Sequence, residues 1–260
     1  MSQATVNDRQ AKSKTAGIAD SFAKSVLLIS FLLILQRLVG FVRSFYVCGA
    51  LTPSHVGQWD LAFNFFVLAA PLSVLGIPGS FGRYLARYEE RGQASRLLRQ
   101  SFSASVVLTM LFAGLAYALR EPISVLFFGD RSQTSLVELL AFGLPVVAIF
   151  NFATSWLTGR RLNRYVFRTQ FAQTLFFATL CVVFFRFHSM SATSVVLAYL
   201  GSCLMGTVLG VGYTILTDPS AEPGASDRSI DPIWKVVLPF AVWVWISDLM
   251  DSLFVLCDRL

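Results

Sequence analysis

The chain has few charged residues, and this shortage excludes two broad classes of protein. Charged residues make up 14% of the 260 residues, whereas a soluble domain averages about 25%. Hydrophobic residues make up 55%, and a disordered chain would need low hydropathy and high charge. The composition therefore excludes disorder and argues against a soluble globular protein.

Residues that bind metals or form disulfides are also scarce. The two histidines, His55 and His188, stand far apart, and the cysteines form no C-x-x-C pair. We interpret these cysteines as small apolar residues: Cys48, Cys181, Cys203 and Cys257. We therefore expect no metal site, no cofactor and no disulfide framework.

Long apolar runs dominate what remains. A membrane-spanning helix needs about 20 apolar residues, and runs of this kind recur seven times. Strands of a membrane barrel would be about ten residues long and would alternate strictly. The sequence predicts an all-α, polytopic integral membrane bundle with about seven transmembrane helices. Their predicted ranges are 25–46, 59–82, 101–119, 135–157, 170–187, 193–216 and 234–257.

The loops differ strongly in lysine and arginine content, which predicts the orientation. Fifteen basic residues lie on one side of the predicted spans and four on the other. Because cytoplasmic loops carry the excess of Lys and Arg, we expect the N-terminus in the cytoplasm. The net charge of +6 then belongs to inner loops, and we expect no nucleic-acid partner. The fifteen are Arg9, Lys12, Lys14, Lys24, Arg83, Arg87, Arg91, Arg96, Arg99, Arg160, Arg161, Arg164, Arg168, Arg228 and Lys235.

Prolines and glycines interrupt two of the predicted spans. Pro71, Gly76, Pro78 and Gly79 lie in the second, and Pro145 lies in the fourth. Proline removes a backbone donor and kinks a helix, which a membrane tolerates where protein or a wet cavity satisfies the free carbonyls. Both an ordinary kinked span and a transporter's broken helix fit this pattern.

Two arginines lie inside the first predicted span. Arg37 is twelve residues from Ser25, about 18 Å into a hydrocarbon core about 30 Å thick. A charge at that depth should face a bundle interior or a water-filled cavity. Arg43 lies about 9 Å further along the helix and also fits an anchor at the outer interface.

Other polar residues in the spans leave alternatives open. Asp60 and Asn64 form an i,i+4 pair, although Asp60 also fits a polar helix start. Asp248 and Asp251 lie three apart in the last span. These two carboxylates fit proton sharing, cation binding or pairing with an arginine such as Arg37.

Small and polar residues occur on the fourth to sixth spans. Asn151, Ser155, Gln170, Gln173 and Thr174 fit either an inward polar lining or contacts that join helices. A second set, Ser202, Gly206 and Gly210, recurs every four residues. This stripe predicts close helix packing.

From Gln36 the chain resembles the multidrug/oligosaccharidyl-lipid/polysaccharide exporter superfamily. The carrying motif is R-x-x-G-F-x-R, formed by Arg37, Gly40, Phe41 and Arg43. A short loop, Gly57, a long helix, the Leu75-Gly76 turn and Arg83 with a basic loop follow in order. The sequence is most similar to polysaccharide biosynthesis flippases of the Wzx type and more distantly to the lipid II flippase MurJ.

The resemblance implies a function. Such proteins flip a lipid-linked oligosaccharide from the inner to the outer leaflet by alternating access, for surface polysaccharides such as lipopolysaccharide. It implies that Arg37 and Arg43 line a basic cavity for a polyprenyl-diphosphate-linked oligosaccharide. From their position in the sequence we expect Asp60 and Asn64 to bind this substrate as well. We expect Asp248 and Asp251 to serve ion coupling or lobe pairing, although Asp248 matches no motif of the superfamily. We expect a bacterial inner-membrane transporter rather than an enzyme, with the lipid bilayer and other polysaccharide-assembly membrane proteins as partners.

The resemblance also implies a division of the chain. Residues 1–24 would form a cytoplasmic tail, 25–216 a six-helix N-terminal lobe, 217–233 a cytoplasmic linker and 234–260 the first helix of a second lobe. The superfamily has two lobes and usually more than 400 residues, so the chain is expected to be a fragment, a truncated product or a half that dimerises.

Two alternative functions remain. A cation-coupled exporter of drugs or small molecules in the same superfamily would need acidic residues deep in the first lobe, where Arg37 is predicted instead. An intramembrane transferase acting on polyprenyl substrates would need paired acidic metal sites, and only the last span offers a candidate.

Overall fold

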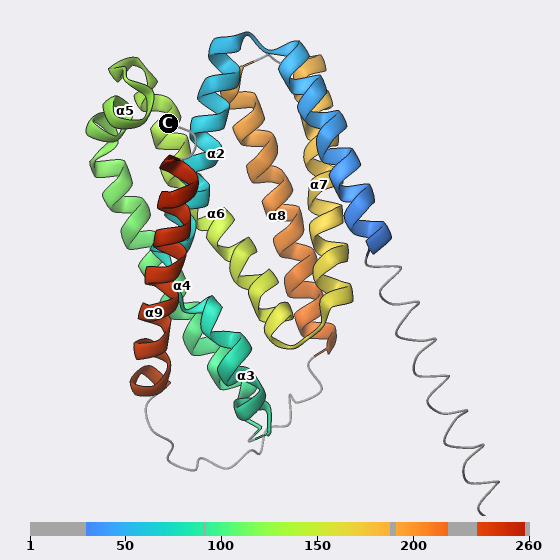
Figure 1. Ribbon diagram of the computed structural model, residues 1–260, viewed down its shortest axis with the longest axis vertical. Helices are drawn as coiled ribbons and strands as arrows, with labels where there is room; N and C mark the ends of the chain where they lie inside the picture. Colours follow the sequence, from blue (N-terminus) through green and yellow to red (C-terminus); the bar gives the residue numbers. More distant parts are fainter. Residues whose placement is uncertain (1–29, 91, 188–190, 218–232, 258–260) are drawn as a thin grey trace, which may run out of the picture.

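The computed structural model describes residues 30–90, 92–187, 191–217 and 233–257, and these residues form an all-helical bundle (Figure 1). The described part begins with a helix over Ser30–Ala50, here called the N-terminal helix. The remaining elements follow in chain order: α2 (Pro53–Ser73), η1 (Pro78–Ser80), α3 (Phe81–Glu90), α4 (Ala94–Ala118), α5 (Arg120–Phe128), η2 (Arg131–Gln133), α6 (Thr134–Gly159), α7 (Asn163–Phe187), α8 (Ala192–Thr217) and α9 (Ile233–Cys257).

Helices long and apolar enough to cross a membrane make up most of this bundle. The described residues contain five such helices, or six if α2 and the segment Pro78–Glu90 form one bent span. The prediction of a polytopic helical membrane bundle is therefore confirmed. The seventh predicted span coincides with α9, a helix of 25 residues, and its crossing of the membrane stays a prediction.

The second predicted span, 59–82, is interrupted by a sharp turn. Helix α2 ends at Ser73, and the chain then bends by 66° into the segment Pro78–Glu90. Leu75 and Gly76 both adopt positive φ, at 48° and 67°, a region that L residues avoid and glycine tolerates. Apolar composition continues across this turn, which is why hydropathy alone did not show it.

The helices also run further into the basic end than hydropathy predicted. Arg83 and Arg87 lie within α3, while Arg96 and Arg99 lie within the first turns of α4. These arginines therefore belong to helices and not to a loop. Hydropathy marks where lipid begins, whereas the helix continues as long as its backbone bonds are satisfied. Arg91, Arg228 and Arg259, like the tail 1–24 and the linker residues 218–232, lie outside the described residues.

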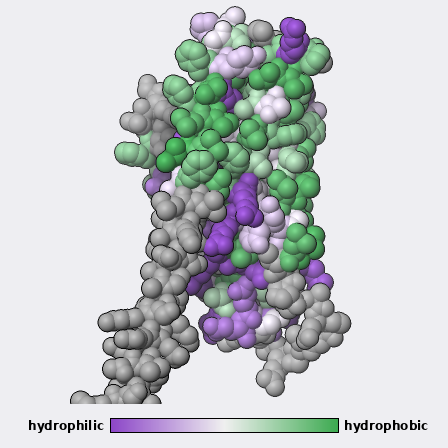
Figure 2. All heavy atoms as spheres, turned by 90° about the vertical axis from the view of Figure 1, so that its right-hand side faces the viewer, coloured by the Kyte–Doolittle hydropathy of each residue, from purple (hydrophilic) through white to green (hydrophobic). Residues whose placement is uncertain are grey.

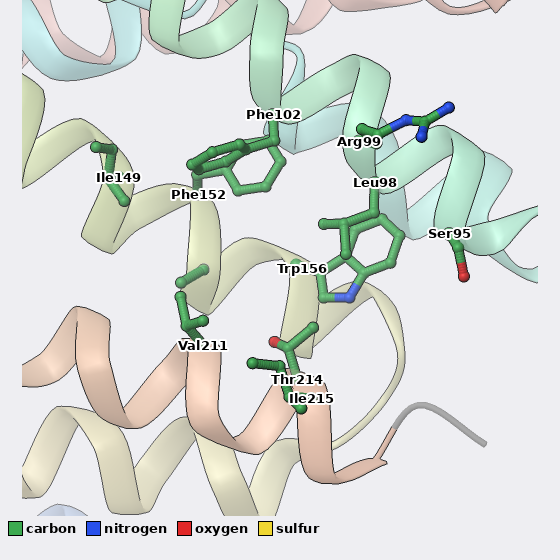
Figure 3. A pocket seen from close by; sticks show the side chains of 11 residues that line it. Ser95, Leu98, Arg99, Phe102, Ile149, Phe152, Trp156, Val211, Thr214 and Ile215 are labelled. Carbon is green, nitrogen blue, oxygen red and sulfur yellow. The ribbon is translucent and has the colours of Figure 1, made fainter. Parts of the chain in front are cut away.

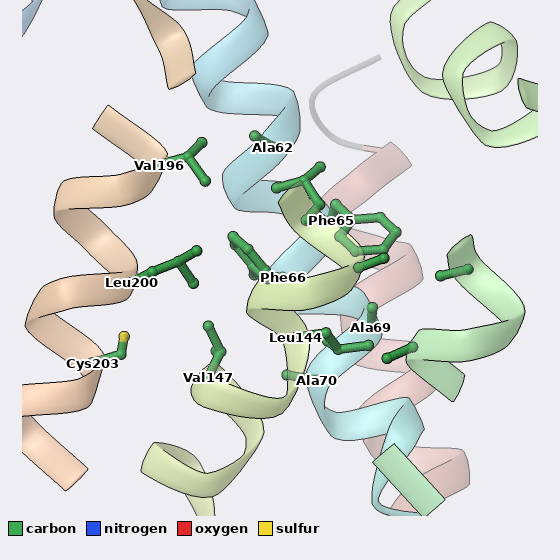
Figure 4. Packing of buried hydrophobic residues seen from close by; sticks show 14 of the residues in the cluster. Ala62, Phe65, Phe66, Ala69, Ala70, Leu144, Val147, Val196, Leu200 and Cys203 are labelled. Carbon is green, nitrogen blue, oxygen red and sulfur yellow. The ribbon is translucent and has the colours of Figure 1, made fainter. Parts of the chain in front are cut away.

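The main core lies where α2, α4, α6 and α8 meet. Phe66 of α2, Leu140 and Leu144 of α6, and Val196 of α8 are almost completely buried there. The close-up shows side chains of α2, α6 and α8 converging on this cluster (Figure 4). Since each buried Leu, Val or Phe makes many short-range contacts, this core fixes the positions of α2 and α8, on which the site depends.

The N-terminal helix, α7 and α8 form a second layer beside this core. Val47, Phe177, Phe185 and Val195 are buried between them. Figure 1 shows the N-terminal helix, drawn in blue, running alongside α7 at the outer side of the bundle. On this side of the molecule, hydrophobic residues cover the upper part of the surface and hydrophilic ones gather toward the lower end (Figure 2).

Candidate functional site

The N-terminal helix packs on the bundle by one narrow face. Val47 is 4% exposed, whereas Phe41 and Phe45 on the other side are 70% and 77% exposed. In the most apolar stretch of this helix, only 6% of the residues are buried. The helix therefore presents most of its surface outward, and its polar side chains divide between the packed and the outer face.

Arg43 lies on the packed side of this helix and is half-buried. Its guanidinium carbon lies 4.2 Å from the ring centroid of Phe177 on α7, within the range of a cation–π contact. A groove of 360 Å³ follows the two helices here, with Val42, Arg43, Tyr46 and Val182 among its lining residues. Arg43 thus lies at a helix junction beside an open groove.

An aromatic cluster surrounds the contact between Arg43 and Phe177. Trp59 of α2 lies 5.7 Å from Phe177, and Tyr199 of α8 lies 5.4 Å from it, between ring centroids. Phe63 packs on both Trp59 and Tyr199, each at 5.7 Å. Sequence reasoning missed this cluster, although the i,i+4 spacing of Trp59 and Phe63 was a signal for it.

Arg37 is exposed on the outer surface of the N-terminal helix. The expectation that it faces a bundle interior or a water-filled cavity stays a prediction. Six residues turn a helix by about 240° relative to a shared face, so Arg37 and Arg43 cannot both point at α7. Among the described residues neither arginine forms an ion pair.

Asp60 and Asn64 lie near the start of α2, close in sequence to the aromatic cluster. Asp60 is exposed and Asn64 is half-buried, and each interacts with a neighbour. Trp59 and Phe63 are adjacent to them in sequence, so the structure brings this turn of α2 to the same region as Arg43. A shared role of Asp60, Asn64 and Arg43 in binding stays a prediction.

The polar residues of α7 join helices. Gln36 of the N-terminal helix donates to the Thr174 hydroxyl at 3.3 Å. Gln173 donates to the Ser202 hydroxyl of α8 at 2.9 Å. These bonds favour helix-to-helix contacts over a free polar lining for Gln173 and Thr174, whereas Asn151 of α6 is exposed.

The small-residue stripe of α8 lets α6 approach closely, as predicted. A methyl group added at Gly206 would lie 2.8 Å from a ring carbon of Phe150, and one added at Gly210 would lie 3.1 Å from the Ala153 side chain.

The break after α2 is held by α9. Trp245 of α9 donates its indole N–H to the Leu72 carbonyl at 3.2 Å, beside the turn where α2 ends. A methyl group added at Gly76 would collide with the Ala241 carbonyl and lie 2.8 Å from the Trp245 nitrogen, and one added at Gly79 would lie 2.5 Å from Val244. Of the two alternatives for this span, the structure shows a broken helix, and a side chain of α9 satisfies one of its carbonyls.

The prolines of the two interrupted spans act differently. Pro71 and Pro145 both lie inside helices that continue past them. Pro78 opens the short helix η1 after the turn. The bend in the second span therefore lies at Leu75 and Gly76, after α2 has continued two residues past Pro71.

Asp248 and Asp251 lie on α9, away from both arginines of the N-terminal helix. Asp248 is half-buried and Asp251 is exposed. The expected alternative of an ion pair with Arg37 does not appear among the described residues. That part of the chain also contains no group of three or more His, Cys, Asp or Glu placed to hold a metal ion. Coupling by these aspartates stays a prediction.

The end of the bundle that carries most arginines is tied together by polar contacts. Arg160, after α6, pairs with Glu89 of α3 at 2.8 Å. Arg83 of α3 lies 4.8 Å from the ring centroid of Phe240 on α9. At the other end of the bundle Arg120 pairs with Glu138, near the start of α6, at 3.3 Å.

The apolar helices and the broken second span define a multi-pass helical membrane protein. A family model described as polysaccharide biosynthesis protein matches residues 22–260. The match covers nearly the whole chain, and the chain belongs to this family. Comparisons with curated proteins and with solved structures gave no match.

Proposed function

We propose that the protein flips a lipid-linked oligosaccharide from the inner to the outer leaflet of a bacterial cytoplasmic membrane, for surface polysaccharide biosynthesis. Membership of the polysaccharide biosynthesis family supports this role. The observation that carries it is Arg43, a half-buried arginine inside an apolar helix and next to a groove. No carboxylate among the residues that the structure describes forms an ion pair with it. An unneutralised cation at such a position marks a pathway for an anion.

The proposed cargo is a polyprenyl-diphosphate-linked oligosaccharide. Arginine suits a diphosphate because its planar guanidinium donates two parallel hydrogen bonds. Arg37, exposed on the outer face of the same helix, would meet the diphosphate if a second lobe covered that face. The aromatic cluster around Phe177 gives Arg43 an apolar support and limits the side from which an anion can approach.

Alternating access would use the two lobes predicted from the sequence. Residues 25–216 would form the first lobe, and α9 would open the second. The 66° bend after α2 and its contacts with α9 supply a junction at which the two could rock. Asp248 and Asp251 on α9 are proposed to serve coupling or lobe pairing, and Asp60 and Asn64 to contact the cargo near the predicted outer end. The N-terminus is proposed to lie in the cytoplasm.

The charge of the N-terminal helix separates this function from export of cationic drugs. Its deep charged groups are Arg37 and Arg43, which repel a cation and attract a diphosphate. An exporter of cations would be expected to place carboxylates there. This favours the anionic cargo.

The experiment is a flipping assay with a fluorescent lipid-diphosphate oligosaccharide in proteoliposomes, with quenching added outside. We expect Arg43→Gln to lower the flipping rate at least about tenfold, because a charge-assisted bidentate contact is lost, and Arg43→Lys to keep part of it. Arg131→Gln is the matched control, since Arg131 is exposed in η2 and does not line the groove beside Arg43. Equal flipping by wild type and Arg43→Gln would overturn the role of Arg43, and no flipping by wild type would overturn the proposal.

A further inference from the structure

A second groove lies at the arginine-rich end of the bundle, between α4, α6 and α8. Its volume is 290 Å³, and its walls include Leu98, Phe102, Phe152 and Trp156. The close-up shows these side chains around the opening, with Arg99 on the α4 side (Figure 3). The groove is separate from the one beside Arg43, which lies between the N-terminal helix and α7.

The shape and lining of this groove fit a hydrocarbon chain. Residues from Ser95 to Phe102 on α4 and from Ile149 to Trp156 on α6 line it, and seven residues of helix extend about 10 Å. That is about a third of the hydrocarbon core of a bilayer. Phe102 and Val211 at the rim are 39% and 42% exposed, so the groove opens sideways to the lipid phase.

The polar groups at the groove point to an anionic head group. Arg99 lines the groove and is exposed, with its guanidinium directed outward from the aromatic rings (Figure 3), and the described residues form no ion pair with it. Trp156 is 2% exposed, and its indole nitrogen has no hydrogen-bond acceptor among the described residues. A buried N–H without an acceptor is unfavourable, and an acyl ester contains carbonyl oxygens that would relieve it. The groove thus combines an apolar slot, a cation at its entrance and an unsatisfied donor in its wall.

We propose that this groove binds an anionic phospholipid of the surrounding membrane. One acyl chain lies between Phe102, Phe152 and Val211, and the phosphate meets Arg99 at the arginine-rich end. Charge complementarity selects the lipid, because a zwitterionic lipid of equal chain length offers the same chain but no net charge to Arg99. This proposal does not depend on the transported cargo, so loss of flipping would leave it intact.

The test is lipid binding by native mass spectrometry of the full chain in detergent, with phosphatidylglycerol and phosphatidylcholine of identical chains as probes. We expect phosphatidylglycerol to bind more tightly. Arg99→Gln should lower that affinity about fivefold, the effect of one basic residue at a membrane surface. Arg96→Gln is the matched control, because Arg96 is exposed three residues earlier on α4 and does not line the groove.

A second pair of variants tests the slot itself. Val211→Trp places an indole at the rim and should lower binding of both lipids, whereas Val208→Trp, at a position 67% exposed on the same helix and outside the groove, should not. Both positions face outward, so folding should be preserved. Equal binding of the two lipids by the wild type would overturn the proposal.

A third probe, undecaprenyl phosphate, distinguishes a membrane phospholipid from a polyprenyl lipid. We expect it to compete weakly with phosphatidylglycerol for the groove. Displacement of phosphatidylglycerol by undecaprenyl phosphate at lower concentration would overturn the assignment to a phospholipid. Equal effects of Arg99→Gln and Arg96→Gln would overturn the assignment of the phosphate to Arg99.

Discussion

Helices α2 and α6 both contain an internal proline, yet the chain turns sharply only after α2. Pro71 and Pro145 each lie within a helix that continues past them. The 66° bend comes after Ser73, where Leu75 and Gly76 adopt positive φ and α9 donates a hydrogen bond to Leu72. The sharp bend therefore coincides with a left-handed turn and a tertiary partner, whereas the proline of α6 leaves its helix continuous.

The largest expected effect is at the turn itself. Gly76→Ala should lower the free energy of unfolding by about 3 kcal/mol or more, because positive φ and overpacking both oppose a methyl group. The added carbon would collide with the Ala241 carbonyl of α9, and backbone cannot move aside easily. Thermal unfolding in detergent measures this. Gly82→Ala is the control, since nothing lies within 4 Å of that position, and equal unfolding temperatures for the two variants would contradict the account of the turn.

Gly143, which lies near the proline of α6, should contribute less to stability than Gly76. A methyl group at Gly143 would lie 2.7 Å from the end of the Leu200 side chain and 3.1 Å from Phe66. Side-chain ends can move, so we expect Gly143→Ala to cost about 1–2 kcal/mol. The same unfolding assay applies, with Gly114→Ala on α4 as the open-space control. A loss larger than that of Gly76→Ala would reverse the comparison.

The hydrogen bond from α9 should contribute a smaller amount. Trp245→Phe keeps an aromatic ring but removes the donor to the Leu72 carbonyl, which should cost about 1 kcal/mol. Trp243→Phe on the same helix is the control, because Trp243 is 69% exposed. If both variants unfold alike, the bond does not hold the break.

The smallest effect is expected from the proline in α2. Pro71→Ala should change stability by less than about 1 kcal/mol and leave the bend in place. Spin labels at Val67→Cys and Arg87→Cys, both exposed positions on either side of the turn, report the bend as a distance in a background with Cys48→Ser. A longer distance between the labels in Pro71→Ala would mean that the span has straightened, and it would show that proline causes the bend.

The helical class and most helix positions could be predicted because lipid imposes a simple rule. A chain that crosses hydrocarbon must satisfy its backbone within each segment, so apolar length predicts helices. The predicted span 135–157 lies within Thr134–Gly159, and 193–216 within Ala192–Thr217. The same rule carries no information on where a helix continues into water, and so the start of α4 at Ala94 and the short helix α5 were missed.

The candidate site was predicted less completely. The sequence singled out Arg43 and Arg37 because a charge in an apolar helix is costly, but it did not show which one faces α7. It also missed Phe177, Trp59 and Tyr199, because aromatics in an apolar run look alike until helices are packed. Similarly, Gln173 fitted both a polar lining and a helix contact, and only its hydrogen bond to Ser202 favours the contact.

The low charge of the sequence and its apolar runs determined by themselves a helical membrane bundle, because solvation by lipid depends on composition alone. The family followed from the order of short motifs together with the match over 22–260. Tertiary structure decided what depends on helix rotation and contact: that Arg43 packs on Phe177, that Arg37 is exposed, and that α9 holds the break after α2. A helix exposes one residue every 100° around its axis, and only its neighbours decide which of those directions is inside.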